Sequence, residues 1–200
     1  PNTRINAWQS GEVDGGWQVP PNAYAQLTSS GKGSLYYGTN TTVVSQIVNN
    51  LSGPLKDVKV RQALLMAIDR QGLIKAGEKG VADPAQALAT RSTWTGVPTS
   101  DVDAYYAELP QYPYDVAKAK ALVADAGISG KKIVIATSPI SSNADILTQA
   151  TAEAAKAIGL VPEIQSISPD KYTSLFSDPA ARKGIDLFFT TWYVSLGDPM

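Results

Sequence analysis

The residue types that most enzymes use for acid–base and nucleophilic chemistry are missing from this chain. Its 200 residues include no histidine and no cysteine. Without histidine, the chain lacks the usual general base, the usual activator of a nucleophile and the commonest transition-metal ligand. Without cysteine, it lacks disulfides and thiolate metal sites. These absences exclude Ser-His-Asp and Cys-His enzymes within this chain, and we expect it to hold neither a metal nor a cofactor.

Two acids that could act together are Asp101 and Asp103, with Asp115 further along the chain and Asp198 near its end. Paired carboxylates can bind calcium or carry out acid–base catalysis, but their spacing here is not that of an EF-hand. Solvated loop acids and, at Asp115, a helix cap explain the same residues more simply. A carboxylate-dependent hydrolase that uses Asp101, Asp103 or Asp198 stays open as an alternative function.

The aromatic pair Trp192 and Tyr193 follows an almost uncharged segment, 185–191, which predicts a buried central strand. In an open α/β sheet, ligands bind beyond the carboxyl ends of the strands. Aromatic rings at such a place supply rigid apolar area for a ligand. The pair is therefore a candidate ligand site, and packing of Trp192 in the core is an equally good explanation.

The overall composition is that of an ordinary globular protein. The hydrophobic share is 44%, and 17 basic residues balance 18 acidic ones to give a net charge of −1. Such a balance gives no electrostatic reason to bind nucleic acid or an anionic membrane. The length suits one sizeable domain or two small ones, and no apolar run approaches the roughly 18 residues that span a bilayer.

A strand, a helix and a second strand follow one another between residues 131 and 167. Apolar runs predict strands at Lys131–Thr137 and Leu160–Ile167, and an Ala-rich stretch predicts a long helix at Asn143–Ile158, closed by Gly159. This succession has the length of a right-handed βαβ unit, so we expect parallel strands. The expected fold class is α/β, with a mixed sheet and flanking helices.

The other predicted elements are shorter. Helices are predicted at Thr3–Ser10, Ala23–Leu27 after an Asn22 cap, Leu73–Ala76, Val116–Ala126 between Asp115 and Gly127, and Asp170–Phe176, and extended structure at Leu35–Val48. Residues 77–113, rich in Gly, Pro, Ser and Thr, predict a long loop region anchored by Trp94.

The segment 57–70 carries the most informative pattern. Asp57 is a good N-cap and suits the helix dipole. Apolar residues that fall on one helical face follow it: Val58, Ala63, Leu64, Ala67 and Ile68. Asp69 and Arg70 come at the far end of this helix, where we interpret them as a structural ion pair or a helix-end interaction.

Several segments together resemble the family 5 extracellular solute-binding proteins, the peptide and nickel receptors of ABC importers. They occur in the family's order: SGEVD at Ser10–Asp14, LKDVKVRQAL at Leu55–Leu64, AIDR at Ala67–Arg70, YDVAKAKALVADAG at Tyr114–Gly127 and TWYVSLGDP at Thr191–Pro199. Residues 57–70 together with 114–127 form a fairly specific combination.

The resemblance implies a non-catalytic bacterial receptor with two lobes, of the type II periplasmic-binding-protein class, that closes on a ligand and delivers it to a membrane permease. Residues 1–38 would be a lead-in from the first lobe and the interlobe crossing. Residues 39–200 would form the second-lobe α/β domain, incomplete at its C-terminus. No signal peptide is visible at Pro1, and the resemblance implies a periplasmic protein or a lipoprotein anchored at the cell surface. The implied partners are a small-molecule or peptide ligand and an ABC permease, and we expect a monomer.

In such a receptor, aromatic faces and a few polar groups would hold the ligand in the interlobe cleft. The best candidates are Trp192, Tyr193 and Ser195, with Trp94 and Trp17 as weaker ones. Ser195 stands where peptide-binding members often carry an Asp that holds the amino terminus of the ligand. Serine can hydrogen-bond but cannot neutralise an ammonium group, so we expect a neutral or weakly charged solute, or a peptide held by other groups. A structural or protein-interaction domain is the third alternative.

Overall fold

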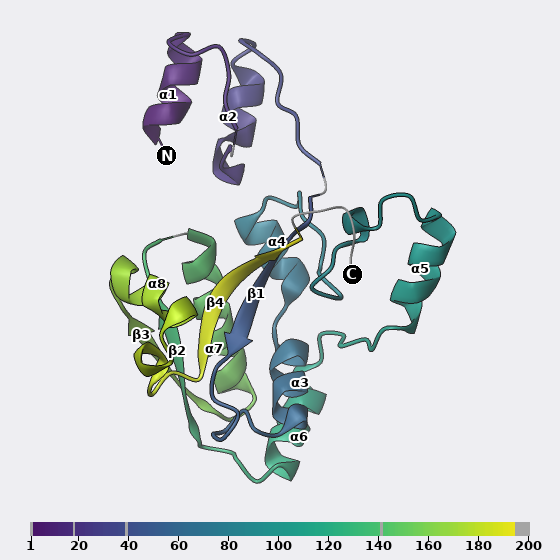
Figure 1. Ribbon diagram of the computed structural model, residues 1–200, viewed down its shortest axis with the longest axis vertical. Coiled ribbons are helices and arrows are strands. Elements are labelled where there is room, and N and C mark those ends of the chain that lie inside the picture. The colour runs from purple at the N-terminus through teal and green to yellow at the C-terminus, as the bar shows by residue number, and fades with distance from the viewer. Residues whose placement is uncertain (1, 18, 39, 141, 195–200) are drawn as a thin grey trace.

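A mixed sheet of four strands, in the order β1–β4–β2–β3, forms the centre of the fold (Figure 1). The computed structural model describes residues 2–17, 19–38, 40–140 and 142–194. The strands are β1 (Thr42–Val48), β2 (Lys132–Thr137), β3 (Val161–Ser166) and β4 (Leu187–Tyr193). β2 pairs in parallel with β3 and β4, whereas β1 and β4 are antiparallel. The expected α/β class with a mixed sheet is confirmed.

Helices flank this sheet and extend beyond it. The α-helices are α1 (Asn2–Ser10), α2 (Tyr24–Ser29), α3 (Val58–Ala67), α4 (Arg70–Gly77), α5 (Thr99–Glu108), α6 (Val116–Asp125), α7 (Ser142–Ala157) and α8 (Pro169–Ser177). Short 3-10 helices are η1 (Pro21–Ala23), η2 (Arg91–Thr93) and η3 (Pro179–Arg182). Among the described residues, no helix is both long enough and apolar enough to cross a membrane.

The predicted βαβ unit is present as β2, α7 and β3. The two strands pair in parallel, from Lys132 opposite Val161 to Thr137 opposite Ser166. The predicted strand at 185–191 is also present, as β4, and it lies inside the sheet between β1 and β2. Only the first part of β4 is buried, because its exposure rises after Phe189.

Apolar side chains fill two clusters around the sheet. The first core cluster joins α3, α6, α7 and the sheet, and its fully buried members include Leu55, Val60, Val123, Ile133 and Ile158. The second core cluster joins α8, the start of α7 and the sheet, and it includes Tyr172, Leu175, Ile185, Phe188 and Phe189. Each fully buried side chain of this size contributes about 1.5–3 kcal/mol of apolar transfer free energy.

The predicted helix caps on α3 and α6 are confirmed. The Asp57 carboxylate accepts a hydrogen bond from the Lys59 amide over 2.8 Å, and the Asp115 carboxylate accepts one from the Lys118 amide over 2.8 Å. After α6, Gly127 has a φ of +66°, the left-handed conformation that favours glycine at this position. An N-cap of this kind contributes about 1 kcal/mol to the stability of its helix.

The structure corrects several predicted element boundaries. Residues 77–113 are not one long loop, because α5 and η2 form within them. Asn22 does not cap α2: the N-cap position is Ala23, which makes no side-chain cap. The strand predicted over Leu35–Val48 begins only at Thr42.

Two details of the 57–70 segment also differ from the prediction. Val58 is 51% exposed and Val60 is buried in its place, whereas the other predicted apolar residues are buried as predicted: Ala63, Leu64, Ala67 and Ile68. Asp69 and Arg70 lie at the start of α4 rather than at the far end of a longer helix, and the Asp69 carboxylate caps α4 through the Gly72 amide. The expected helix-end interaction is therefore present, but on the following helix.

Residues 1–38 carry α1 and α2, which lie beyond the end of the sheet in Figure 1 and join β1 through an extended stretch. This lead-in buries little: Ile5 and Ala23 are its buried apolar residues among those described. The division at residues 38 and 39 into a lead-in and a second-lobe domain stays a prediction.

Candidate ligand-binding site

The strand β4 extends beyond its neighbour β2. Along its whole length it pairs with β1, from Leu187 opposite Val48 to Tyr193 opposite Thr42. On its other side, within the described ranges, β2 pairs with β4 only at Leu187 and Phe188. Residues 189–193 therefore have a strand neighbour on one side only, and we call this part of β4 the overhang.

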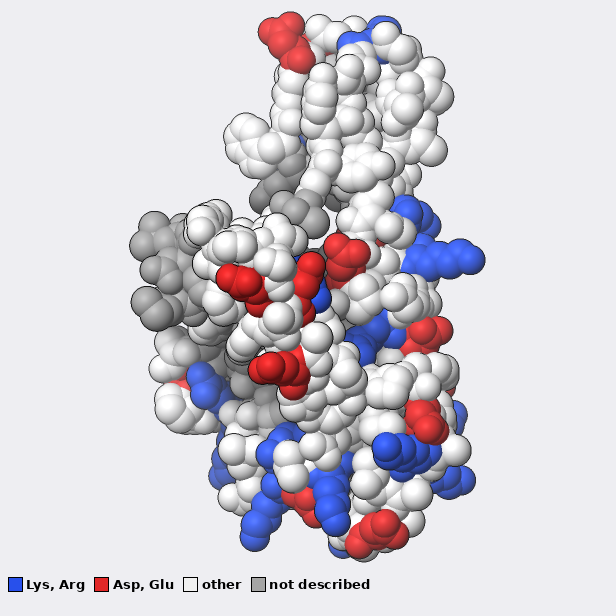
Figure 2. Space-filling view, turned by 90° about the vertical axis from the view of Figure 1, so that its right-hand side faces the viewer, with Lys and Arg blue, Asp and Glu red and all other residues white. Residues whose placement is uncertain are grey.

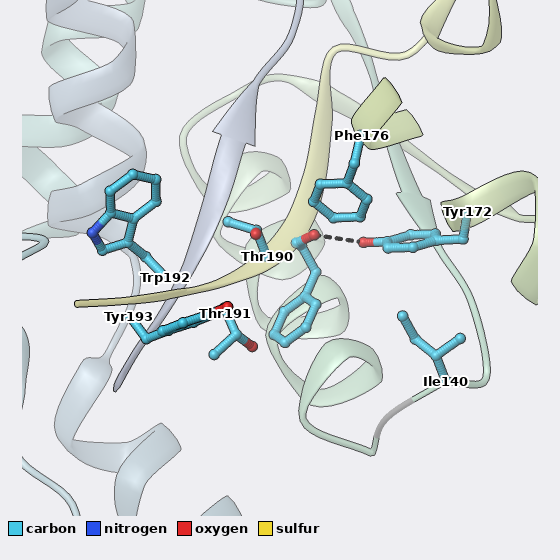
Figure 3. A pocket seen from close by; sticks show the side chains of 8 residues that line it. Ile140, Tyr172, Phe176, Thr190, Thr191, Trp192 and Tyr193 are labelled. Atoms are coloured by element: carbon cyan, nitrogen blue, oxygen red, sulfur yellow. Dashed lines mark hydrogen bonds between the residues drawn. The ribbon is translucent and has the colours of Figure 1, made fainter. Parts of the chain in front are cut away.

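A hollow with a volume of about 610 Å³ lies beside the overhang (Figure 3). Its lining comes from β4, α8 and the loop after β2: Ile140, Tyr172, Phe176, Phe189, Thr190, Thr191, Trp192 and Tyr193. The hollow is open to solvent and is lined mostly by apolar and aromatic side chains with a few hydroxyl groups, a mixture that ligand-binding surfaces also use.

The backbone of the overhang directs hydrogen-bonding groups toward its open side. The Tyr172 hydroxyl donates to the Phe189 carbonyl over 2.9 Å, so this carbonyl points away from β1. In an antiparallel strand, the N–H and C=O of one residue point to the same side, and this side alternates along the strand. Thr191 and Tyr193 therefore present their backbone groups to the open side, where a strand-like ligand could bond to them.

Aromatic side chains of α8 pack against an aromatic side chain of β4 beside the hollow. The ring of Phe176 meets that of Phe188 edge-on with centroids 5.5 Å apart, and Tyr172 meets Phe188 edge-on at 6.3 Å. Burial raises the pKa of Tyr172 to about 12. The phenol is thus neutral at physiological pH and holds the position at which the overhang begins.

The predicted aromatic pair lies at the end of the overhang, on opposite faces of β4. Figure 3 shows Trp192 and Thr190 on one side of the strand and Tyr193 and Thr191 on the other. Trp192 is 51% exposed and Tyr193 is 63% exposed, so neither ring is packed in the core. The alternative explanation, that Trp192 is a core residue, therefore does not hold in this structure.

The other predicted ligand-binding residues lie elsewhere or outside the described ranges. Ser195 is outside them, so its role stays a prediction. Trp94 packs against Tyr105 with ring centroids 5.1 Å apart and donates from its indole nitrogen to the Tyr106 hydroxyl. Trp17 is 78% exposed in the lead-in. Neither Trp94 nor Trp17 lines the hollow, and both stay predictions as ligand contacts.

The acids considered for catalysis are not gathered at the hollow. Asp101 and Asp103 lie on α5 rather than in a loop, and Asp103 forms an ion pair with Arg91 on the surface. Asp198 lies outside the described ranges. In the part of the chain that the structure describes, no three acidic residues lie together as a metal site.

Several lining residues were missed by the sequence analysis. Tyr172 and Phe176 stand four residues apart on α8, a spacing that places both on one face of a helix. That spacing is an available signal, but it does not tell which strand the face will meet. Ile140, Thr190 and Thr191 carry no comparable signal.

The whole chain, residues 1–200, matches the family model described as bacterial extracellular solute-binding proteins, family 5, middle region. The chain belongs to this family. The expected resemblance is confirmed, and the family is one of solute-binding proteins rather than of enzymes.

Curated relatives of this family 5 protein include the glutathione-binding protein GsiB of Salmonella choleraesuis. The two are 28% identical over 199 residues, which cover 98% of this chain and 37% of the relative. This chain therefore spans less than two fifths of the length of the relatives it matches.

Solved structures show the same fold. HbpA2 from Haemophilus parasuis matches with a TM-score of 0.74 at 22% identity, over 99% of this chain and 38% of that one. The periplasmic binding protein DppA from Helicobacter pylori, in complex with the peptide STSA, matches with a TM-score of 0.71 at 21% identity, over 99% of this chain and 36% of that one.

Proposed function

We propose that the complete protein is an extracytoplasmic solute receptor of an ABC importer, and that this chain supplies one wall of its ligand cleft. The protein would be periplasmic or anchored to the cell surface as a lipoprotein. It would act as a monomer, deliver its ligand to a membrane permease, and catalyse no reaction.

The overhang of β4 is the observation that carries this proposal. It combines an open backbone edge at Thr191 and Tyr193 with a 610 Å³ hollow and two exposed aromatic rings. A catalytic pocket would instead bring together acids or a nucleophile and its base. Exposed rings beside a free strand edge favour binding by stacking and by backbone hydrogen bonds.

The ligand class that fits this edge is a short peptide or a peptide-like solute in an extended conformation. Its backbone would bond to Thr191 and Tyr193, while its side groups would alternate between the two faces of β4. The names of the relatives agree with this class, since one is a glutathione-binding protein and another holds a peptide. Because Ser195 cannot neutralise an ammonium group, we propose that a free amino terminus is not required.

Titration calorimetry of the complete protein would test the aromatic contact. The probes are glutathione, a tripeptide with a free amino terminus, the same tripeptide N-acetylated, and maltose. We expect a peptide-like probe to bind, and Tyr193→Ala to weaken its binding about ten- to a hundred-fold, because a buried aromatic platform contributes about 1–3 kcal/mol. Ser195→Asp should strengthen binding of the free-amine tripeptide over the acetylated one.

A second pair of variants tests the backbone edge. Thr191→Pro removes an N–H that points away from β1, and proline is tolerated at such edge positions. We expect about a tenfold loss of affinity, because one hydrogen bond to the ligand is lost. The matched control Thr191→Ala keeps the N–H and should bind almost normally. If neither Tyr193→Ala nor Thr191→Pro changes the affinity for the peptide probes, the ligand binds elsewhere.

A further inference from the structure

The segment 84–112, which contains η2 and α5, leaves the sheet and its flanking helices after α4 and returns before α6 (Figure 1). We call it the excursion. Arg70 holds its two ends together, donating to the Ala85 carbonyl over 3.1 Å and to the Tyr112 carbonyl over 2.7 Å. The base of the excursion is thereby fixed to the start of α4.

Side-chain contacts also hold the excursion together internally. Thr93 is fully buried, and its hydroxyl donates to the Thr90 carbonyl over 2.7 Å. Tyr106, which is 2% exposed, receives the Trp94 indole N–H at its hydroxyl and the Arg91 guanidinium 4.4 Å from its ring centroid. The excursion therefore forms a packed unit rather than a free loop.

The part of the excursion around η2 reaches the chain just before β1. The Thr90 and Ser92 hydroxyl oxygens lie 2.7 Å apart, and they lie 3.0 Å and 2.6 Å from the carbonyl oxygen of Asn40. Because each hydroxyl carries one proton, one of them donates to the other and the second donates to the carbonyl. The Asn40 side chain in turn accepts a hydrogen bond from the Thr42 amide over 2.9 Å. Asn40 is thus fixed on both sides, at the point where the extended stretch from the lead-in enters the sheet.

We propose that Thr90 and Ser92 are positioning residues that set the pivot of the interlobe crossing. This inference rests on the proposed function, because it concerns closure of two lobes. The hydrogen-bonded pair of hydroxyls on one carbonyl fixes the backbone at Asn40, so that bending between the lobes does not extend into Asn40 and Thr42. Without these hydroxyls, the pivot would extend to Thr42, and the ligand-free receptor would sample a wider range of lobe orientations.

Distance measurements between spin labels in the complete protein test this proposal. This chain contains no cysteine, and labels can be placed at Ala25→Cys on α2 and Ala117→Cys on α6, where both residues are exposed. The double variant Thr90→Val with Ser92→Ala should broaden the ligand-free distance distribution. With glutathione and the tripeptides as probes, it should also weaken binding about three- to tenfold, since closure must order more of the chain.

Three further variants separate positioning from general damage. Ser100→Ala removes a hydroxyl from the same excursion without touching Asn40, and it should leave the distribution unchanged. Thr90→Ser keeps the donor and should behave as wild type, whereas Ser92→Ala alone should give a smaller broadening. If the double variant keeps the wild-type width, the proposal is wrong. If no probe moves the lobes of the wild type, the proposed function fails, and the ligand-free widths still decide the role of Thr90 and Ser92.

Discussion

Tyr172 connects the second core cluster to the hollow beside β4. It is 1% exposed, its ring packs against Phe188, and its hydroxyl reaches the Phe189 carbonyl. That carbonyl belongs to the first residue of the overhang, which has no pairing partner in β2 among the described residues. Tyr172 therefore occupies the side of β4 on which the pairing with β2 has ended, and the backbone beyond it would be available to the proposed ligand.

The raised pKa of Tyr172 predicts a loss of stability at alkaline pH. Because the pKa rises from 10.0 to about 12 on folding, the folded protein keeps a proton that the unfolded chain loses above pH 10. Its contribution is fully present below pH 10 and is lost as the pH rises toward 12, by up to about 2–3 kcal/mol. Urea unfolding at pH 9, 10 and 11 should show this decline in wild type. Tyr172→Phe should lower stability at pH 9 by about 1 kcal/mol but flatten the decline, and an equally steep decline in the variant would contradict the assignment.

Among the elements, α3 and α4 show that the family-like segments are used here to hold the backbone. Arg61 donates to the Leu55 carbonyl over 2.7 Å and to the Lys56 carbonyl over 2.8 Å, which fixes the turn before α3. Arg70 likewise donates to carbonyl groups at the two ends of the excursion, those of Ala85 and Tyr112. These segments resemble the family, but Arg61 and Arg70 bind carbonyl groups of this chain and do not line the hollow.

Arg61→Ala should therefore destabilise the fold without changing ligand contacts. Two carbonyls lose a charged donor, and we expect a loss of about 1–3 kcal/mol in the free energy of unfolding. Arg61→Lys should recover part of it, because lysine keeps the charge but not the planar fork of donors. Urea denaturation measures both, and Lys59→Ala, which changes an exposed basic residue on the same helix, is the control. If Arg61→Ala leaves the free energy of unfolding unchanged, water replaces these hydrogen bonds in the variant.

At the scale of the whole molecule, the two parts of the chain are stabilised very differently. The sheet and its flanking helices, which we call the sheet domain, hold both core clusters. The lead-in, by contrast, has large exposed aromatic side chains, with Tyr36 at 88% and Trp17 at 78% exposure. On the face shown in Figure 2, basic and acidic side chains are mixed over the sheet domain and few charges lie on the lead-in. On this face, charges of both signs are interspersed, in contrast to the continuous basic surfaces that bind nucleic acid.

The isolated chain should consequently melt in one cooperative transition that belongs to the sheet domain. Calorimetry tests this, and hydrogen exchange should show fast exchange at Ile5 and slow exchange at Ile135, because the lead-in buries little. The isolated chain should also bind the peptide probes poorly, since closure of two lobes cannot occur. A broad melt with strong binding of a hydrophobic dye would mean that the sheet domain needs further chain to fold.

The sequence by itself determined the elements whose signals are local. The Asp57 and Asp115 caps, the left-handed Gly127 and the βαβ unit follow from short-range hydrogen bonds, backbone sterics and periodicity, and all are present. Sequence also placed the aromatic pair at the end of β4. The sequence did not predict α5, because this helix lies in a segment rich in loop-forming residues and is held by contacts with η2, including that of Asp103 with Arg91.

Only the tertiary structure decided which surfaces are available to the proposed ligand. Whether a strand end is open depends on how far its neighbours extend, and here β2 stops at Thr137 while β4 runs on to Tyr193. No local pattern encodes that difference, because it arises when strands from residues 42, 132 and 187 onward are brought together in one sheet. For the same reason, the contact of Thr90 and Ser92 with Asn40, 50 and 52 residues away in the sequence, could be found only in the folded chain.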